Sequence, residues 1–414
     1  MKRITRGTLA LLLALTLILP MLGHVALASG EVATINFWYW DVSMDATYKA
    51  MFDAYSAEHP NVKVTLTQAP WSDYWTKLQT ALPTGEGPDI FWLNHPNAVT
   101  YLPTGLVSSI QQYIDSGAID MSNFAQSLYD PYTIGGQVYC VPIFFDTIAI
   151  AYNKQILTEA GYPDGPPADW TWKDLKDIAK TLTTDGVYGF ASSSDGQSTT
   201  MDFILQNGSD LYSEDGLTSI LAADKNVETI KFLLGLIEDK VSPTQAEQKE
   251  IPSLDMFQND MIAMIPFGLW STAPTYEIMG DNLGIAPNPK NVRQGTIVHN
   301  LGYAASAQTK HPAEVAELMA YFASKDHGDR IAEVFAPAYT ASQELWFQKF
   351  GELSVNVFTD GLAYAKGLMI SKKNAGQVFS LYETEMDKLF QMNNPDIKVE
   401  LTRIQELLNA EIAK

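Results

Sequence analysis

The sequence predicts an α/β fold in which mostly parallel sheets are covered by helices and arranged in two lobes. In the first hundred residues, segments with the two-residue period of a strand alternate with segments of helical period, an order typical of a parallel sheet. The chain has 414 residues, of which 46% are hydrophobic. Because single cores stop growing at about 250–300 residues, we expect two lobes, each held together by burial.

The first part of the chain supplies the strand–helix order. Residues 32–40 are apolar and aromatic, which favours a strand. Residues 44–59 carry apolar side chains at helical spacing, and residues 62–66 alternate apolar with polar side chains as a strand does. A second amphipathic helix is predicted at residues 71–82, and a third strand at residues 89–93.

The centre and the C-terminal part continue this pattern. The predicted elements are a hairpin at 135–142, a strand at 143–154, a helix beginning at Thr171, a strand at 300–305, a helix beginning at Pro312 and a mainly helical part from about 341. Thr171 is followed three residues later by Asp174, a capping-box pattern. Asp146 interrupts a long apolar run, and a carboxylate is costly to bury unpaired. We therefore expect Asp146 to face a wet crevice.

The N-terminus predicts export. Lys2, Arg3 and Arg6 precede an apolar run over residues 9–22, and Ala26-Leu27-Ala28 supplies the small-x-small pattern of a cleavage site. The run is too short for a membrane-spanning helix. We therefore expect a signal peptide at residues 1–28, cut after Ala28. No cysteine lies near the cut, so we expect no lipid anchor and a protein in the periplasm or at the outer face of the cell envelope.

Charge and cysteine content exclude several classes of function. Removing Lys2, Arg3 and Arg6 with the signal peptide moves the net charge from −21 to −24, which argues against nucleic acid and anionic lipid as partners. Cys140 is the single cysteine, so no intramolecular disulfide forms, and we expect it to pack as a small apolar residue. The six histidines are scattered without metal-ligand spacing. We expect neither a metal nor a cofactor.

Asn94 marks the most informative strand end. It follows the run Pro88-Asp89-Ile90-Phe91-Trp92-Leu93, which reads as a buried strand after the Gly-rich turn Gly85-Glu86-Gly87. Open α/β sheets bind small molecules in the crevice outside the carboxyl ends of their strands. An exported chain with such a strand end, and with tryptophans nearby, is typical of a protein that binds small polar ligands.

Five motifs give the chain a resemblance to a known family. In order, they are Gly85-x-Gly87-Pro88-Asp89-Ile90, Gly136-x-x-Tyr139-x-Val141-Pro142, Tyr152-Asn153-Lys154, Thr171-Trp172-x-x-Leu175 and Phe257-x-x-x-x-x-Ala263-Met264-x-x-x-Gly268-x-Trp270. The chain resembles the extracellular solute-binding proteins, family 1, of bacterial ABC importers, the carbohydrate binders related to maltose-binding protein. It departs from many relatives at Pro337-Ala338-Tyr339, where they carry Pro-Ala-Arg. That departure puts one contact to a ligand hydroxyl or acid in doubt.

The resemblance implies a type II periplasmic-binding-protein-like clamp with a three-segment hinge. By analogy the chain crosses between the lobes near Asp146, near His299 to Gly302 and near Pro337 to Ser342. The N-terminal lobe would hold residues 29–145 and 301–338, and the C-terminal lobe residues 146–300 and 339–414. Such a protein captures a sugar or oligosaccharide between its lobes and delivers it to the transmembrane subunits of an ABC permease. It is expected to be a monomer and not an enzyme.

The predicted ligand-binding residues are Trp40, Asp41, Trp71, Trp92, Asn94, Asp146, Trp270 and Tyr303. A sugar needs flat aromatic rings for its C–H faces and carboxylates or amides for its hydroxyls. Each aromatic also has a structural alternative, since Trp40, Trp71 and Trp92 lie on apolar elements where core packing is common. The structural alternative for Asp146 is a hydrogen bond that fixes the hinge.

Two other functions remain open from the sequence. Aromatic residues with paired acids also describe secreted glycoside hydrolases, although the chain completes no hydrolase, metalloprotease or phosphate-loop motif. A clamp of the same shape could hold a polyamine or another small cation, which the acidity would suit.

Overall fold

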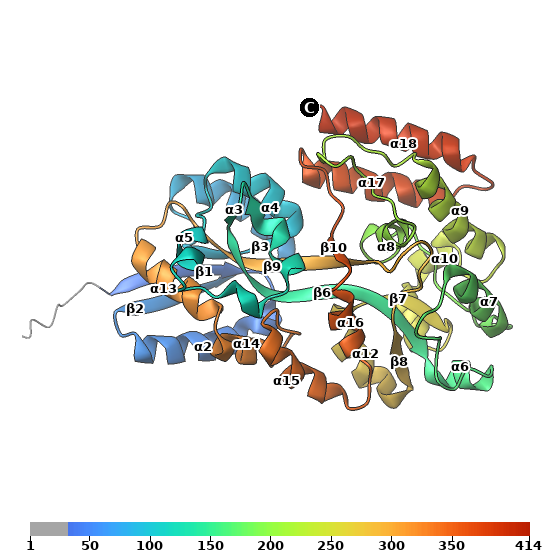
Figure 1. Ribbon diagram of the computed structural model, residues 1–414, viewed down its shortest axis with the longest axis horizontal. Helices are drawn as coiled ribbons and strands as arrows, with labels where there is room; N and C mark the ends of the chain where they lie inside the picture. Colours follow the sequence, from blue (N-terminus) through green and yellow to red (C-terminus); the bar gives the residue numbers. More distant parts are fainter. Residues whose placement is uncertain (1–31) are drawn as a thin grey trace, which may run out of the picture.

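The computed structural model describes residues 32–414. The predicted signal peptide, residues 1–28, and the expected cut after Ala28 lie outside these residues. Figure 1 shows two lobes side by side, one holding β1, β2 and β3 (the first lobe) and the other holding β7, β8 and the C-terminal helices (the second lobe). Among the described residues, no helix is long and apolar enough to cross a membrane.

The strands form one eight-stranded sheet and a small hairpin. Their bounds are β1 Ala33–Tyr39, β2 Val62–Gln68, β3 Ile90–Asn94, β4 Thr133–Ile134, β5 Gln137–Val138, β6 Cys140–Asn153, β7 Met264–Gly268, β8 Leu283–Ala286, β9 Thr296–Ala305 and β10 Ala365–Gly367. The order of the main path is β2-β1-β3-β9-β6-β7, with β10 beside β9 and β8 beside β6. The expected parallel sheet is confirmed for β2-β1-β3. Strands β9 and β6 run antiparallel to their neighbours on this path.

Helices cover both lobes (Figure 1). Their bounds are α2 Asp45–Glu58, α3 Trp71–Ala81, α4 His95–Tyr101, α5 Gln111–Asp115, α6 Lys154–Glu159, α7 Trp172–Leu182, α8 Met201–Gln206, α9 Asp224–Glu238, α10 Gln245–Glu250, α11 Ser253–Gln258, α12 Thr272–Met279, α13 Pro312–Phe322, α14 Lys325–Ile331, α15 Gln343–Phe347, α16 Asn356–Gly361, α17 Ala375–Phe390 and α18 Ile397–Ile412.

Two helix starts predicted from the sequence, at Thr171 and at Pro312, are confirmed. Thr171 caps α7 by accepting a hydrogen bond from the backbone of Asp174, and the Asp174 carboxylate accepts from the Thr171 backbone in return. Two orphaned N–H groups at the start of the helix are satisfied in this way. Pro312 occupies the first position of α13, where its missing N–H costs nothing.

Two long strands join the lobes. β6 and β9 run from one lobe into the other (Figure 1) and pair with each other from Cys140↔Ala304 to Thr147↔Val298. The register shifts between Pro142 and Phe144. A third segment meets them there, because the Ala338 backbone N–H donates to the Ile143 carbonyl. The three segments predicted as crossings therefore lie together beside this irregularity.

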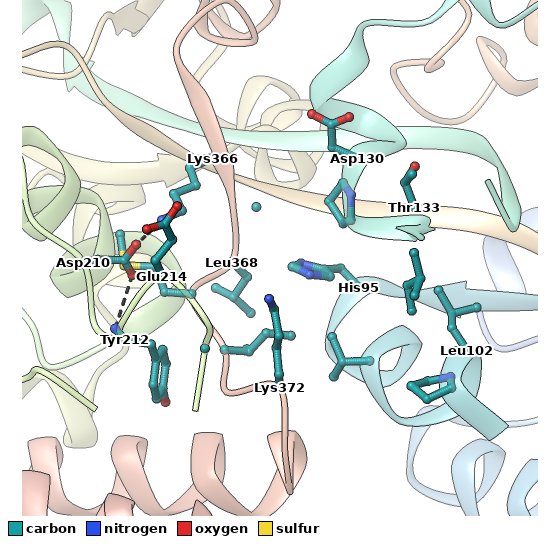
Figure 2. Close-up of a pocket in the computed structure, with 18 of the residues that line it drawn as sticks. His95, Leu102, Asp130, Thr133, Asp210, Tyr212, Glu214, Lys366, Leu368 and Lys372 are labelled. Carbon is teal, nitrogen blue, oxygen red and sulfur yellow. Dashed lines mark hydrogen bonds and ion pairs between the residues drawn. The ribbon is translucent and has the colours of Figure 1, made fainter. Parts of the chain in front are cut away.

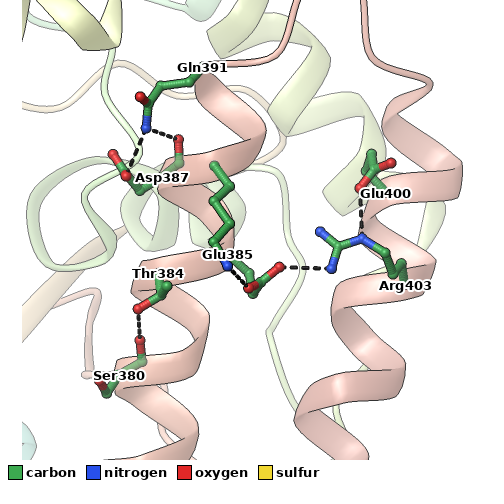
Figure 3. Close-up of polar contacts among 8 residues, drawn as sticks. Ser380, Thr384, Glu385, Asp387, Gln391, Glu400 and Arg403 are labelled. Atoms are coloured by element: carbon green, nitrogen blue, oxygen red, sulfur yellow. Dashed lines mark hydrogen bonds and ion pairs between the residues drawn. The ribbon is translucent and has the colours of Figure 1, made fainter.

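The C-terminal helices α17 and α18 pack as a pair, held by a polar cluster (Figure 3). Glu385 on α17 accepts hydrogen bonds from Lys388 at 2.5 Å and from Arg403 on α18 at 2.7 Å. Arg403 also donates to Glu400 at 2.9 Å. Cys140 is buried in the core, as expected.

Candidate functional site

Four neighbouring strands carry the residues at the centre of the candidate site. Gly268 of β7 pairs with Ile148 of β6, Asp146 of β6 with His299 of β9, and Val298 of β9 with Gly367 of β10. Directly opposed residues of an antiparallel pair project on the same face of the sheet. Asp146 and His299 therefore project on the same face. We call the part of β7, β6, β9 and β10 that carries Gly268, Asp146, His299 and Gly367 the cleft floor.

The carboxyl group of Asp146 is half-buried in this floor. Burial raises its pKa from the ordinary 3.8 to about 7. Within residues 32–414, no side chain donates a hydrogen bond to it. At neutral pH the group is therefore divided between an ionised acceptor and a protonated donor.

Next to Asp146 lies the imidazole of His299, which has no well-aligned hydrogen bond. Both ring nitrogens are buried without a partner in the described part of the chain. Burial lowers the pKa of His299 to about 4, although the Asp195 carboxylate and the backbone of Asp146 act in the opposite direction. At neutral pH the ring is uncharged and offers one donor and one acceptor.

His95 extends the floor toward the first lobe. A Cβ atom added at Gly367 would lie 3.1 Å from the His95 ring, so the ring packs directly over the β10 backbone. Its Nδ1 atom is also buried without a partner among residues 32–414. Burial, and then the neighbouring His299, lower the pKa of His95 to about 4.

Trp270 stands at the other end of the floor. β7 ends at Gly268, and the 3-10 turn Leu269–Ser271 follows at once. A Cβ atom added at Gly268 would lie 2.2 Å from the Trp270 ring, so glycine is what lets the indole fold back over the strand end. The ring is perpendicular to His299, with 5.3 Å between centroids, and Trp270 is 46% exposed. It presents a flat apolar surface to the solvent side of the floor.

Of two neighbouring acids in the second lobe, Asp195 lines a cavity together with Trp270, and Glu383 lies next to Asp195. Asp195 begins the π-helix Gly196–Thr200 and accepts hydrogen bonds from the Gln197 and Ser198 backbone. The Gly196 N–H donates to the Glu383 carboxylate of α17 at 3.0 Å. Burial, and then Asp195, raise the pKa of Glu383 to about 7. A cavity of about 260 Å³ beside them is lined mainly by short polar and apolar side chains, including Ser193, Asp195, Ser198, Ser253, Trp270 and Ser271.

The first lobe contributes an aromatic cluster of Trp40, Trp71, Tyr74, Trp75 and Trp92. Trp40 lies at its centre, with ring centroids 4.8–5.5 Å from each of the other four. Trp71 is 51% exposed, whereas Trp92 is fully buried. Trp92 also contacts Phe144 at 5.7 Å, two residues before Asp146. The cluster is therefore continuous with the strand that carries the floor.

A cavity of about 920 Å³ opens beside the β10 end of the floor (Figure 2). His95, Leu102 and Thr133 line one side, and Tyr212, Glu214 and Lys372 line the other. Lys366 of β10 pairs with Asp210 at its edge. Because Gly367 belongs both to this cavity and to the floor, the two form one continuous surface between the lobes.

The structure brings some of the predicted binding residues together. Asp146 and Trp270 both adjoin His299, and Trp40 and Trp71 share the aromatic cluster. Asp41 accepts a hydrogen bond from the Ser43 backbone. Asn94 caps α4 by accepting from the Asn97 backbone and side chain. Both oxygens thus hold local turns. The Asp41 carboxylate keeps further acceptor capacity, whereas the Asn94 oxygen already accepts two hydrogen bonds and the side chain offers its NH2 group as a donor.

Trp92 and Tyr303 lie instead in the core of the first lobe. They are cross-strand partners on β3 and β9, and neither is exposed. The Trp92 indole donates to the Tyr48 hydroxyl at 2.8 Å, and Tyr303 shares a 2.9 Å hydrogen bond with the same hydroxyl. Because their polar atoms are satisfied internally, neither side chain reaches the cleft in this conformation.

His299, Asp195 and Glu383 were not predicted from the sequence as binding residues. His299 carried a usable signal, because it interrupts the apolar strand Thr296–Ala305 as Asp146 interrupts its own strand. Asp195 and Glu383 carried none, since the contact between Gly196 and Glu383 joins positions 187 residues apart. Among residues 32–414, no three His, Cys, Asp or Glu side chains group as a metal site would require.

Comparison with known proteins matches most of the chain to one family. The model of the bacterial extracellular solute-binding proteins matches residues 41–329. The lactose-binding protein of Rhizobium radiobacter is 25% identical over 84% of this chain and 80% of its own length. The maltotriose-binding protein of Pyrococcus abyssi is 25% identical over 72% of this chain and 60% of its own length.

A solved structure shares the same fold. The sugar-binding protein MalE of the phytopathogen Xanthomonas citri superposes with a TM-score of 0.82, covering 92% of this chain and 98% of its own, at 16% sequence identity. The fold was therefore predicted correctly as a two-lobed type II clamp.

Proposed function

Because this chain belongs to the bacterial extracellular solute-binding protein family, we propose that it captures a sugar or oligosaccharide between its lobes and delivers it to the membrane permease of an ABC transporter. Membership of an extracellular family agrees with the predicted export. The ligand leaves the protein chemically unchanged, and the permease subunits are the macromolecular partner. The relatives named for lactose and maltotriose support a sugar over the polyamine alternative.

One observation carries this proposal: an exposed indole just after β7 and an unpaired carboxyl group on β6 both lie next to His299. Pyranose rings have C–H-lined faces and hydroxyl-bearing edges. Trp270 offers a flat apolar surface to a ring face, and Asp146 offers a hydrogen bond to a ring edge. Bonds to charged groups contribute about 1.5–3 kcal/mol each. One stacked ring and a few such bonds are enough for micromolar affinity, about −8 kcal/mol.

We assign the direct contacts to Trp270 and Asp146 at the floor and to Trp40, Asp41, Trp71 and Asn94 on the first lobe. Trp92 and Tyr303 support this surface from the core. The 920 Å³ cavity that continues from His95 gives room for more than a single ring, since it lies at the upper end of the volumes that drug-sized ligands occupy. An oligosaccharide that extends from Trp270 toward β10 fits this arrangement.

The hinge is assigned to the three segments near Asp146, near His299 to Gly302 and near Pro337 to Ser342. The lobes then divide at 145/146, 300/301 and 338/339, as the sequence predicted. A ligand that contacts both lobes favours the closed form, because only that form makes both sets of contacts.

Intrinsic tryptophan fluorescence titrated with a panel of sugars tests this function, because binding at Trp270 changes the environment of an exposed indole. The panel includes lactose, maltotriose, longer maltodextrins and, as the rival cation, spermidine. We expect a saturable response to at least one sugar. Trp270→Ala should weaken that binding by about tenfold or more, equivalent to at least about 1.4 kcal/mol.

Ile278→Ala is the matched control, since Ile278 is an exposed apolar residue of α12 in the same lobe. It should bind the sugar as the wild type does. A response to spermidine alone would favour the cation binder. Chromatographic recovery of altered sugar would reveal an enzyme. The absence of both a fluorescence response and a thermal shift with every sugar would contradict the proposal.

A further inference from the structure

The imidazole of His299 is a polar group that the protein leaves unsatisfied at the centre of the cleft floor. Both ring nitrogens are buried without a partner among residues 32–414. A buried donor or acceptor without a hydrogen bond is destabilising, and native proteins hold few of them. The residues two positions away on the same face of β9, Ile297 and Leu301, are apolar. An apolar residue at position 299 would avoid this cost.

The surroundings of the ring offer its nitrogens no side-chain partner, and the nearby Asp146 backbone is not aligned for a hydrogen bond. Trp270 meets it edge to face and Asp146 is its cross-strand neighbour, yet neither side chain forms a hydrogen bond with it. A bound metal does not account for the unpaired nitrogens, because His, Cys, Asp and Glu side chains in the described chain form no group of three around one point. A ligand hydroxyl at the floor would supply the missing partner.

We propose that His299 is a specificity-determining residue that reads two hydroxyls of the ligand, donating a hydrogen bond to one and accepting a hydrogen bond from another. Asp146, beside it, binds the same edge of the ligand. An ammonium group cannot accept from the imidazole and a carboxylate cannot donate to it, so a neutral ligand with hydroxyls satisfies both nitrogens. The two ring nitrogens point away from each other, so the two hydroxyls lie on separate parts of the ligand and not on adjacent carbons. This inference rests on the proposed sugar-binding function and narrows it to a neutral sugar that presents two separated hydroxyls to the floor.

Calorimetric titration of a histidine variant with deoxy sugars tests this inference. The ligands are the sugar that binds the wild type most tightly and its single-position deoxy analogues. In the wild type, loss of a hydroxyl read by His299 should weaken binding by about tenfold to a hundredfold, because the buried nitrogen is again left unpaired. His299→Phe keeps a flat ring without nitrogens. It should bind the parent sugar more weakly by a similar factor and no longer distinguish the parent from that deoxy analogue.

His59→Phe is the matched control, because His59 stacks on Tyr55 at the end of α2 with ring centroids 4.2 Å apart, and phenylalanine can keep that stack. This variant should retain the wild-type deoxy profile. His299→Gln retains a donor and an acceptor and should recover part of the affinity. If the phenylalanine variant does not unfold cooperatively, the affinities of His299→Gln for the parent sugar and for the deoxy analogues test the inference instead.

The outcomes distinguish failure of this inference from failure of the proposed sugar-binding function. If no sugar binds the wild type, the proposed function fails. If Trp270→Ala loses the sugar while His299→Phe keeps both the parent affinity and every deoxy penalty within about twofold, only the reading role of His299 is wrong.

Discussion

The Asp146 carboxyl group makes the stability of the protein depend on pH. Its pKa is raised by burial to about 7 in the folded chain, against 3.8 ordinarily. Between these values the folded state holds a proton that the unfolded state has released. By linkage, the contribution of Asp146 to the free energy of unfolding therefore falls as pH rises from about 4 to about 7. Above pH 7 this contribution does not change further.

Asp146→Asn removes this titration, so we expect the variant to be more stable than the wild type at pH 8 and to match it near pH 4. At about 1.4 kcal/mol per pKa unit, the gain has an upper bound of about 4 kcal/mol. Urea unfolding at a series of pH values measures it. Asp53→Asn, at an exposed position, should show no such trend. A difference between Asp146→Asn and wild type that did not grow with pH would contradict the buried-carboxyl account.

Single residues also show what the sequence could and could not predict about the site. Asp146 was placed at a crevice because a carboxylate is costly within an apolar strand, and the structure leaves it half-buried and unpaired. The same argument would have found His299. Trp92 was chosen by its resemblance to a sugar-stacking aromatic and Tyr303 by its place at the second crossing, but their cross-strand register directs both toward Tyr48. Register is a property of two strands and is not visible in either one.

At the scale of elements, the pair α17–α18 depends on one buried carboxylate. The Glu385 side chain is 7% exposed, and hydrogen bonds from Lys388, and then from Arg403, lower its pKa against the effect of burial. Removing one partner leaves a buried charge undercompensated.

Arg403→Met should therefore lower the free energy of unfolding by about 1–3 kcal/mol at neutral pH. The loss should shrink at acid pH, where Glu385 is protonated in both folded and unfolded chains. Lys173→Met removes an exposed ion pair of α7 and should lower the free energy of unfolding much less than Arg403→Met does. Equal losses for the two variants by chemical denaturation would show that burial of Glu385 is unimportant.

Elements with local signals were predicted well, and elements that depend on distant neighbours were missed. The helix beginning at Thr171 has its own cap and apolar stripe, so its sequence specifies it. β10 is three residues long, Ala365–Gly367, and is defined by pairing with β9. The π-helix Gly196–Thr200 is held partly by Glu383 of α17. Neither has a period of its own to detect.

At the scale of the whole molecule, the two-lobed shape predicts a ligand-dependent change in dimensions. A compact chain of the expected mature length has a radius of gyration of about 21 Å, and two separated lobes exceed that value. Small-angle scattering should show a smaller radius with the saturating sugar than without it. Trp270→Ala at the same sugar concentration should retain the larger radius. Superimposable wild-type curves with and without bound sugar would contradict closure around the ligand.

The overall arrangement followed from length and from motif order more than from any single element. Two lobes were expected because one core could not serve a chain of this size, and the resemblance to the solute-binding family placed a crossing near Asp146. The contact between α4 and α17, which joins the two lobes at the cavity, had no counterpart in the sequence.

The packing of Cys140 has a practical consequence. This is the single cysteine of the chain, and burial both hides its sulfur and raises the pKa of the thiol well above its usual range. Maleimide dyes react with exposed thiolates, so the native protein should give no background labelling. A cysteine introduced at the rim of the cleft could then carry a dye at one defined position, and the protein would become an optical reporter of its own cargo.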